Sequence, residues 1–244
     1  MRPPFQIFPL PANLAFHVVQ EFIQLSNTAA DLREKTNIAL SGGSTPKMLF
    51  QLLSQSPYRD KIKWEVLHFF WSDERCVPPD HPESNYGMTQ KKLLQYIKIP
   101  NSNIHRIKGE SLPDEAAHSY STEIYKNVPS YDDGIPRFDW ILLGVGDDGH
   151  TASLFPGSEV LYIRDKLCAV AVHPVSGQHR ITMTLPLINH AKRVTFLVTG
   201  KSKRKIVFDI FNQTPGFERY PAAHVNPVQG KLVWLLDKAA AKFK

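Results

Sequence analysis

A short segment of the chain places glycines, carboxylates and a histidine directly after an apolar run. Residues 138–143 are mostly apolar, and Gly144-Val145-Gly146-Asp147-Asp148-Gly149-His150-Thr151 follows. The pattern predicts a buried strand that ends in a loop whose backbone can fold tightly around a small ligand. Histidine titrates near neutral pH, so His150 is a candidate general base. Asp148, two residues earlier, is a candidate for fixing the orientation of the imidazole.

Two other interpretations of this segment are weaker. Gly144, Gly146 and Gly149 match the dinucleotide pattern G-x-G-x-x-G and come close to the P-loop pattern. However, the two adjacent aspartates would repel a pyrophosphate, and Pro156-Gly157 limits any helix after the glycines. A metal site could combine His150, one aspartate and a distant third ligand, but the chain has no His-x-x-x-His pair and no cysteine cluster. Nucleotide binding and metal binding therefore remain alternatives that the residues favour less than a general base.

Two more polar segments follow predicted strands. Ser41-Gly42-Gly43-Ser44-Thr45-Pro46 leads from a short strand into a helix. Its glycine amides, its hydroxyls and the helix dipole favour a phosphate site, with an ordinary capped turn as the alternative. Pro46 suits the first helical position, with Ser44 or Thr45 as the cap. The second segment is Ser72–Arg75, and we expect both segments to lie beside the histidine loop, because the carboxyl ends of parallel strands meet at one sheet edge.

Three basic residues are candidates for contacting an anion. Arg75 could clamp a phosphate or carboxylate through two hydrogen bonds, or it could form a structural salt bridge with Asp73 or Glu74. Lys203 lies at the start of a predicted helix, where a cation is unfavourable. It therefore either faces an anionic ligand or lies on a solvated helix end. Arg180 opens a predicted strand, with a surface ion pair as its alternative role.

The alternation of apolar patterns along the chain predicts an α/β protein. Helical spacing of apolar residues and short apolar runs follow one another throughout. We therefore predict a single domain over residues 1–244, a three-layer α/β/α fold with a mainly parallel, Rossmann-like sheet. Helices are expected at about 12–35, from 46, from 84–85, at 113–127, from about 203 and at 238–243. Strands are expected at 37–40, 66–71, 104–107, 138–143, 167–172, 180–185, 193–199 and 231–236.

Composition and charge narrow the class of protein. The 244 residues carry a formal net charge of +6. The basic run Lys201–Lys205 has no interleaved aromatic residues, so an anionic metabolite or a solvated surface fits better than nucleic acid. Two cysteines, Cys76 and Cys168, are too few for a disulfide framework and favour a reducing cytoplasm. Cys76, next to Arg75, could be a thiol of lowered pKa or simply a small apolar residue. No apolar run has the length of a signal peptide or membrane span, and we expect neither membrane association nor an obligate protein partner.

Taken together, these segments resemble the 6-phosphogluconolactonase family. The resemblance covers nearly the whole chain in order, and Gly149–Gly157 is its most specific part. The matching segments are 41–46, 72–78, 84–87, 144–157, 180–184, 198–203 and 221–223, with Trp234. The resemblance implies hydrolysis of 6-phospho-D-glucono-1,5-lactone in the oxidative pentose phosphate pathway, without a metal or cofactor. It also implies catalytic roles for His150, Asp148 and Arg75, and substrate contacts from Gly42, Gly43, Ser44, Thr45, Asn85, Arg180 and Lys203.

Two alternatives belong to other classes of protein. Glucosamine-6-phosphate deaminases share the glycine–serine segment and the Asp-Gly-His sequence, but typically continue as GHIAFNEPG, whose glutamate partners the histidine. Here Thr151–Gly157 contains no carboxylate, and Asp73-Glu74-Arg75 stands where the deaminases have DEY. Both differences favour the lactonase. The third possibility is a non-catalytic module that binds sugar phosphates, which tight binding without turnover would identify.

Overall fold

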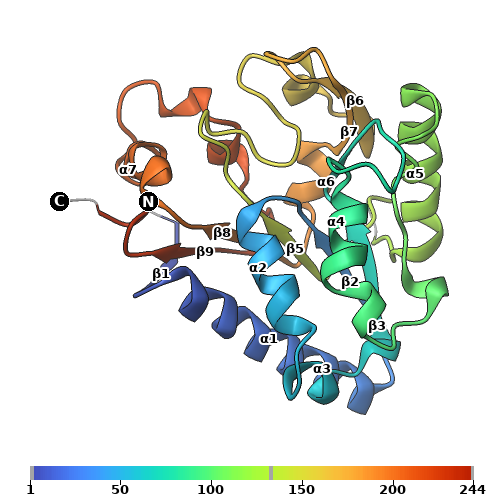
Figure 1. Ribbon diagram of the computed structural model, residues 1–244. Helices are drawn as coiled ribbons and strands as arrows, with labels where there is room; N and C mark the ends of the chain where they lie inside the picture. Colours follow the sequence, from blue (N-terminus) through green and yellow to red (C-terminus); the bar gives the residue numbers. More distant parts are fainter. Residues whose placement is uncertain (1–2, 132–133, 243–244) are drawn as a thin grey trace.

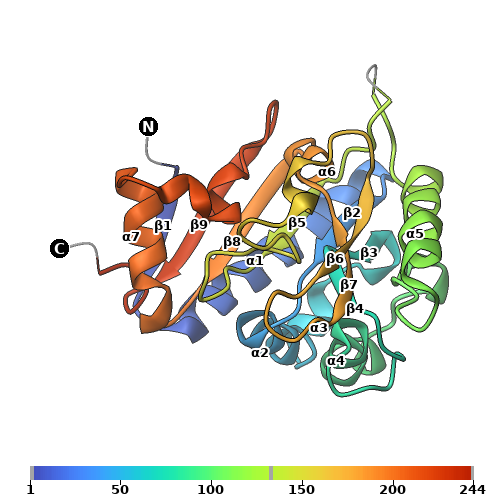
Figure 2. The same cartoon turned by 90° about the horizontal axis from the view of Figure 1, so that it is seen from above.

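The computed structural model describes residues 3–131 and 134–242, and its central feature is a six-stranded parallel sheet (Figures 1 and 2). The strand order is β1-β9-β8-β5-β2-β3, and every neighbouring pair is parallel. The strands are β1 (Phe5–Phe8), β2 (Thr36–Leu40), β3 (Leu67–Trp71), β5 (Trp140–Leu143), β8 (Arg193–Val198) and β9 (Lys231–Asp237). All side chains of β2, β3 and β5 are buried although alternate ones point to opposite faces, so both faces of the sheet are covered.

Helices flank this sheet, as the predicted three-layer α/β/α fold requires. The helices are α1 (Pro11–Leu32), α2 (Ser44–Leu53), α3 (Tyr58–Lys61), α4 (Asn85–Lys92), α5 (Pro113–Asn127), α6 (Leu185–Asn189) and α7 (Arg204–Asn212). In both views α7 lies beside β1 and β9, and α5 lies at the opposite end of the sheet (Figures 1 and 2). Leu14, Val18 and Phe22 form the buried stripe of α1, at the spacing seen in the sequence. No helix among the described residues is long and apolar enough to cross a membrane.

The largest departure from the predicted fold is a second, antiparallel sheet. It contains β4 (Asp73–Arg75), β7 (His179–Met183) and β6 (Cys168–Val172), in that order. Both of the later strands were expected, but without their own sheet, and 72–75 was expected only as the polar end of a strand. The direction of the chain reverses between β6 and β7, so they pair as a hairpin, and β4 is too short for an apolar pattern to reveal it.

Smaller predictions were also wrong. Residues 104–107 contribute only an isolated bridge between Ile104 and Phe69, and β1 was not predicted. A terminal helix was expected at 238–243, but 238–240 form a turn and 241–242 are irregular, while residue 243 lies outside the described residues. Asp237 accepts the Ala240 amide in the manner of a helix cap, and it also accepts the Gly200 amide, which ties this turn to the neighbouring loop.

The end of the sheet near β3 contains a buried chain of imidazoles. His68 Nδ1 lies 3.0 Å from His105 Nε2, and His105 Nδ1 lies 2.7 Å from a carboxylate oxygen of Glu123. Because the carboxylate accepts, His105 donates from Nδ1 to Glu123. Burial, followed by the charges of His105 and Lys35, lowers the pKa of His68 from 6.5 to about 4.

This pKa shift predicts a loss of stability at acidic pH. The unfolded chain protonates His68 near pH 6.5 whereas the folded protein does so only near 4, so the unfolded state binds more protons between these values. The free energy of unfolding should therefore fall as the pH decreases through this window, by up to about 1.4 kcal/mol per pH unit for this group. Urea unfolding of wild type and His68→Gln at several pH values tests it. The curve of the variant should be flatter, and parallel curves would contradict the assignment.

Candidate active site

The segment after β2 presents helix amides to the carboxyl edge of the sheet. α2 begins at Ser44, Gly43 precedes it with φ of 103°, and no side chain of the described residues caps its first turn. This corrects the prediction that Ser44 or Thr45 forms the cap and that Pro46 is the first helical residue. Thr45 instead pairs its hydroxyl with that of Thr199 at 2.8 Å. The uncapped amides at the positive end of the helix dipole are suited to an anion.

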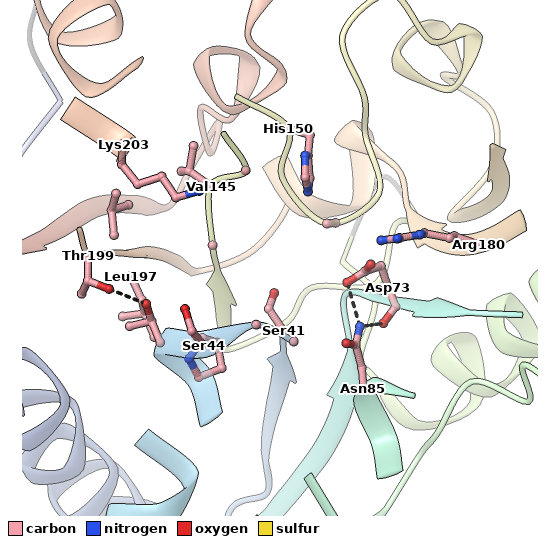
Figure 3. Close-up of a pocket in the computed structure, with 18 of the residues that line it drawn as sticks. Ser41, Ser44, Asp73, Asn85, Val145, His150, Arg180, Leu197, Thr199 and Lys203 are labelled. Atoms are coloured by element: carbon pink, nitrogen blue, oxygen red, sulfur yellow. Dashed lines mark hydrogen bonds between the residues drawn. The ribbon is translucent and has the colours of Figure 1, made fainter. Parts of the chain in front are cut away.

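Gly42 allows a close approach between this segment and α4. A Cβ at Gly42 would lie 1.8 Å from Oδ1 of Asn85, so a larger residue would displace that side chain. Asn85 in turn donates from Nδ2 to the backbone carbonyl of Asp73 at 3.0 Å. The Asp73 carboxylate accepts the Ser153 hydroxyl at 2.7 Å. Asn85 and Asp73 are both buried, and together they form one wall of the site (Figure 3).

Two arginines lie directly opposite one another on the small sheet. Arg75 of β4 and Arg180 of β7 are register partners, an arrangement in which like charges repel. Each has a buried Nε for which no described residue provides a partner. Burial, followed by the charge of Arg75, lowers the pKa of Arg180. An anion between the two guanidinium groups would relieve the repulsion and satisfy these donors.

Within the described residues, neither Arg75 nor Arg180 forms the salt bridge that was considered as its alternative role. Arg75 donates to the backbone carbonyl of Glu83 and has no salt bridge there to Asp73 or Glu74. Glu74 instead accepts from Ser84 Oγ and from amides at the start of α4, and burial raises its pKa. Burial and the charge of Glu74 raise the pKa of Cys76, which favours the alternative of a small apolar residue over a reactive thiol.

The loop after β5 holds a histidine–carboxylate pair. His150 Nδ1 lies 2.6 Å from Oδ1 of Asp148, and the His150 amide donates to the same oxygen at 3.1 Å. Burial alone would raise the pKa of Asp148, but the hydrogen bonds from His150 and its charge outweigh burial and lower this pKa to about 2. The ionised carboxylate accepts a hydrogen bond from Nδ1–H, which leaves Nε2 as the basic nitrogen.

Gly146 makes this pairing sterically possible. A Cβ there would lie 2.1 Å from His150 Nδ1 and 2.7 Å from Asp148 Oδ1. The Gly146 amide also donates to the His150 carbonyl at 2.8 Å, which closes the turn. The glycine that resembled a nucleotide motif is therefore required by the histidine and its carboxylate.

Lys203, which follows β8 in the chain, contacts the same loop. It lies in a short 3₁₀ segment, Lys201–Lys203, immediately before α7, and its Nζ lies 2.5 Å from Oδ1 of Asp147. The hydrogen bonds from Lys203 and Ser202 lower the pKa of Asp147, whose side chain is 75% exposed. The side chain of Lys203 is itself mostly buried, and the residue lines the cavity described below.

These segments enclose one cavity of about 220 Å³ at the carboxyl edge of the sheet. In Figure 3, Lys203 and Arg180 extend into it from opposite sides and His150 lies between them. The cavity spans β2 and β5, where the connections change direction, which is the usual ligand position in such sheets. Its walls include the sequence-predicted residues Gly42, Gly43, Ser44, Thr45, Arg75, Asn85, His150, Arg180 and Lys203.

Other site residues were missed or have a different placement. Asp148 does not line the cavity but holds His150 from behind. Asp73 and Thr199 line it and were not proposed, although the position of each at the end of a strand was a usable signal. Over the described ranges, no three His, Cys, Asp or Glu side chains gather into a group that could hold a metal ion.

Comparison with known proteins identifies the family. The model of the family described as "Glucosamine-6-phosphate isomerases/6-phosphogluconolactonase" matches residues 9–234. The chain belongs to this family. It is 46% identical over 237 residues to the 6-phosphogluconolactonase of Haemophilus influenzae, covering 96% of this chain and 97% of that protein.

Solved structures agree with this assignment. A crystal structure of devB protein has a TM-score of 0.92 and 44% identity, with 98% of each chain covered. The 6-phosphogluconolactonase of Trypanosoma brucei has a TM-score of 0.87 and 28% identity, covering 99% of this chain and 98% of that one. Both likenesses extend over the parallel sheet and the second, antiparallel sheet together.

Proposed function

We propose that this protein hydrolyses 6-phospho-D-glucono-1,5-lactone to 6-phospho-D-gluconate, in the oxidative pentose phosphate pathway. The observation that carries the proposal is the combination, in one cavity, of uncapped helix amides, three cationic side chains and a histidine with a free basic nitrogen. The similarity to the lactonase of Haemophilus influenzae supports the choice of substrate. We further propose that the reaction requires no metal and no cofactor.

In the proposed reaction His150 acts as the general base. Its Nε2 takes a proton from a water molecule while the water oxygen attacks C1 of the lactone. The tetrahedral oxyanion collapses with cleavage of the bond between C1 and the ring oxygen, and His150 returns the proton to that oxygen. Asp148 keeps the imidazole in the tautomer that leaves Nε2 unprotonated and stabilises the imidazolium.

The polar and cationic groups of the cavity contact different parts of the substrate. The amides of Gly42 and Gly43, with Ser44 and Thr45 at the start of α2, cradle the 6-phosphate, and Lys203 and Arg180 supply positive charge. Arg75 stabilises the oxyanion and the carboxylate of the product. The side chain of Asn85 forms a hydrogen bond with a hydroxyl group of the substrate.

The geometry gives no support to a deaminase mechanism with a second carboxylate. Among the described residues, Asp148 is the carboxylate hydrogen-bonded to His150. In the segment where deaminases typically carry their glutamate, Ser153 is buried and its hydroxyl donates to Asp73. Thr151, in the same segment, is buried as well.

Replacing each of the three cationic side chains with alanine should change the kinetic constants in different ways. We expect Lys203→Ala and Arg180→Ala mainly to raise KM, by about tenfold or more, because a phosphate contact stabilises the substrate and the transition state alike. Arg75→Ala should also lower kcat, since its interaction strengthens as negative charge develops on the oxyanion. Steady-state kinetics with thermal unfolding of each variant measures this. Normal kinetics in all three would leave the net charge of +6 as surface charge only.

A structure with bound 6-phosphogluconate tests the assignment of the site. The phosphate should lie at residues 42–45 and the C1 carboxylate should face His150 and Arg75. An anion bound away from both would overturn this arrangement.

We also propose that the protein acts in a reducing compartment such as the cytoplasm. Its two cysteines are free, and Cys168 is buried, where burial raises its pKa to about 12. Neither an obligate protein partner nor a membrane is part of the proposal.

A further inference from the structure

The loop that carries His150 rests against a segment some 70 residues further along the chain. The Gly149 carbonyl accepts from the Ala222 amide at 3.1 Å. The ring of Tyr220 lies directly against Gly149, because a Cβ there would be 2.3 Å from Cδ1 of the ring. Gly149 has a φ of +84°, so the backbone turns at this contact in a conformation that favours glycine. The loop therefore cannot move toward Tyr220.

Tyr220 is itself fixed from behind. Its hydroxyl donates to Oδ2 of Asp209 at 2.8 Å and accepts from Arg219 at 2.7 Å. Tyr220 and Asp209 are 6% and 5% exposed. The Asp209 carboxylate also accepts from Lys205 at 2.6 Å and from the Thr214 hydroxyl at 3.0 Å. The ring that contacts Gly149 is thus held by a buried carboxylate with several donors.

Asp209 lies in α7, the helix that follows Lys203. The loop is therefore connected to this part of the chain at two places, through Lys203 and Asp147 on one side and through Asp209, Tyr220 and Gly149 on the other. Inside the loop, the Gly149 amide donates to the Gly146 carbonyl at 3.1 Å, and the Gly146 amide donates to the His150 carbonyl. A displacement of Gly149 would thus be passed to the imidazole within one turn.

We propose that Tyr220, fixed by Asp209, is a positioning residue that holds the His150 loop in its catalytic geometry. It does not line the cavity, so it acts through the loop and not through contact with substrate. The inference rests on the proposed lactonase function, because it assigns Tyr220 a role in that same reaction.

Replacing the ring tests the proposal. In Tyr220→Leu the space beside Gly149 opens, and we expect kcat for the lactone to fall about 10- to 100-fold, as displacements of about 1 Å do in active sites. KM should change less than about threefold, because the phosphate contacts are made by other residues. Tyr220→Phe keeps the ring and removes only the hydroxyl bonds; it should fold even if the leucine variant does not, and its kcat should fall by about threefold or more.

Thr214→Val is the matched control. It removes another hydroxyl hydrogen bond from the same Asp209 carboxylate but leaves the contact between Tyr220 and Gly149 in place. Its Tm should decrease about as much as that of Tyr220→Phe, while its kcat stays within about twofold of wild type. Equal losses of kcat in these two variants would mean that the network serves only stability.

A double variant separates positioning from a purely structural role. If Tyr220 acts through His150, then Tyr220→Leu should lower kcat no further in a His150→Gln background. Independent, multiplicative losses would overturn the proposal. So would a normal kcat in Tyr220→Leu when the wild-type enzyme is active, with the lactonase function left intact. A wild-type protein without lactonase activity would instead reject the proposed function itself.

Discussion

Replacing His150 with alanine or glutamine is expected to lower kcat for the lactone by about 10²- to 10⁴-fold, the usual contribution of a positioned general base. The loss should appear in kcat and not in KM, because the imidazole acts on the attacking water while other residues hold the phosphate. Asp148→Asn should have a smaller effect in the same direction, since the amide no longer fixes the tautomer that leaves Nε2 basic. Initial rates with freshly prepared lactone, corrected for its spontaneous hydrolysis, measure both effects.

His173 provides a control of the same residue type next to the site, and it does not line the cavity. The centroid of its ring lies 5.1 Å from that of Phe155, and the centroid of the His150 ring lies 4.9 Å from the same phenylalanine ring. The Nδ1 of His173 accepts from the Ser176 amide, so this histidine is engaged in its own hairpin. His173→Gln should keep kcat within about threefold of wild type, because it contributes no proton transfer. A near-normal kcat in His150→Gln would instead show that His150 is not the general base.

The second large loss of kcat is expected when a single methyl group is added at Gly146. Gly146→Ala would place a Cβ 2.1 Å from His150 Nδ1 and 2.2 Å from Cε1, distances that cannot be kept. Either the imidazole or the Asp148 carboxylate must move, and their 2.6 Å hydrogen bond is lost or bent. We expect kcat to fall about 10²-fold from this misplacement.

Gly144→Ala is the matched substitution two residues earlier in the loop. A Cβ at Gly144 has no atom within 4 Å, and its φ lies outside the left-handed region. Gly144 lines the cavity, so an added methyl group can weaken substrate binding and raise KM. The variant should nevertheless keep its Tm and, within about threefold, its kcat. If both alanine variants lose kcat equally, the loop depends on glycine flexibility in general, and the specific contact between Gly146 and the histidine is not the cause.

The fold was largely predictable because its strands are buried on both faces. Runs such as Trp140–Leu143 are apolar throughout, which distinguishes them from the spaced apolar residues of α1. β4 was not predictable in the same way, because Asp73–Arg75 is a charged tripeptide. Its strand geometry comes from pairing with β7, more than 100 residues further along the chain.

The site was predictable to the extent that strand topology alone determines it. Parallel strands bring the segments after β2 and β5 to one edge, so residues 42–45 and His150 could be placed together from the sequence. Contacts between side chains distant in sequence could not. The Lys203–Asp147 pair and the contact of Tyr220 with Gly149 depend on how the chain after β8 packs against the loop. The register that places Arg75 opposite Arg180 likewise has no local signal.

The most direct test compares two substrates on one preparation of the purified protein, with a chelator present. Loss of fresh 6-phospho-D-glucono-1,5-lactone is followed by NMR, and release of ammonia from glucosamine-6-phosphate is followed by a coupled assay. We expect rapid lactone hydrolysis that the chelator does not change, and no ammonia. Ammonia release would identify a deaminase, and tight binding of 6-phosphogluconate without turnover of either substrate would identify a binding module; either result would contradict the proposed function.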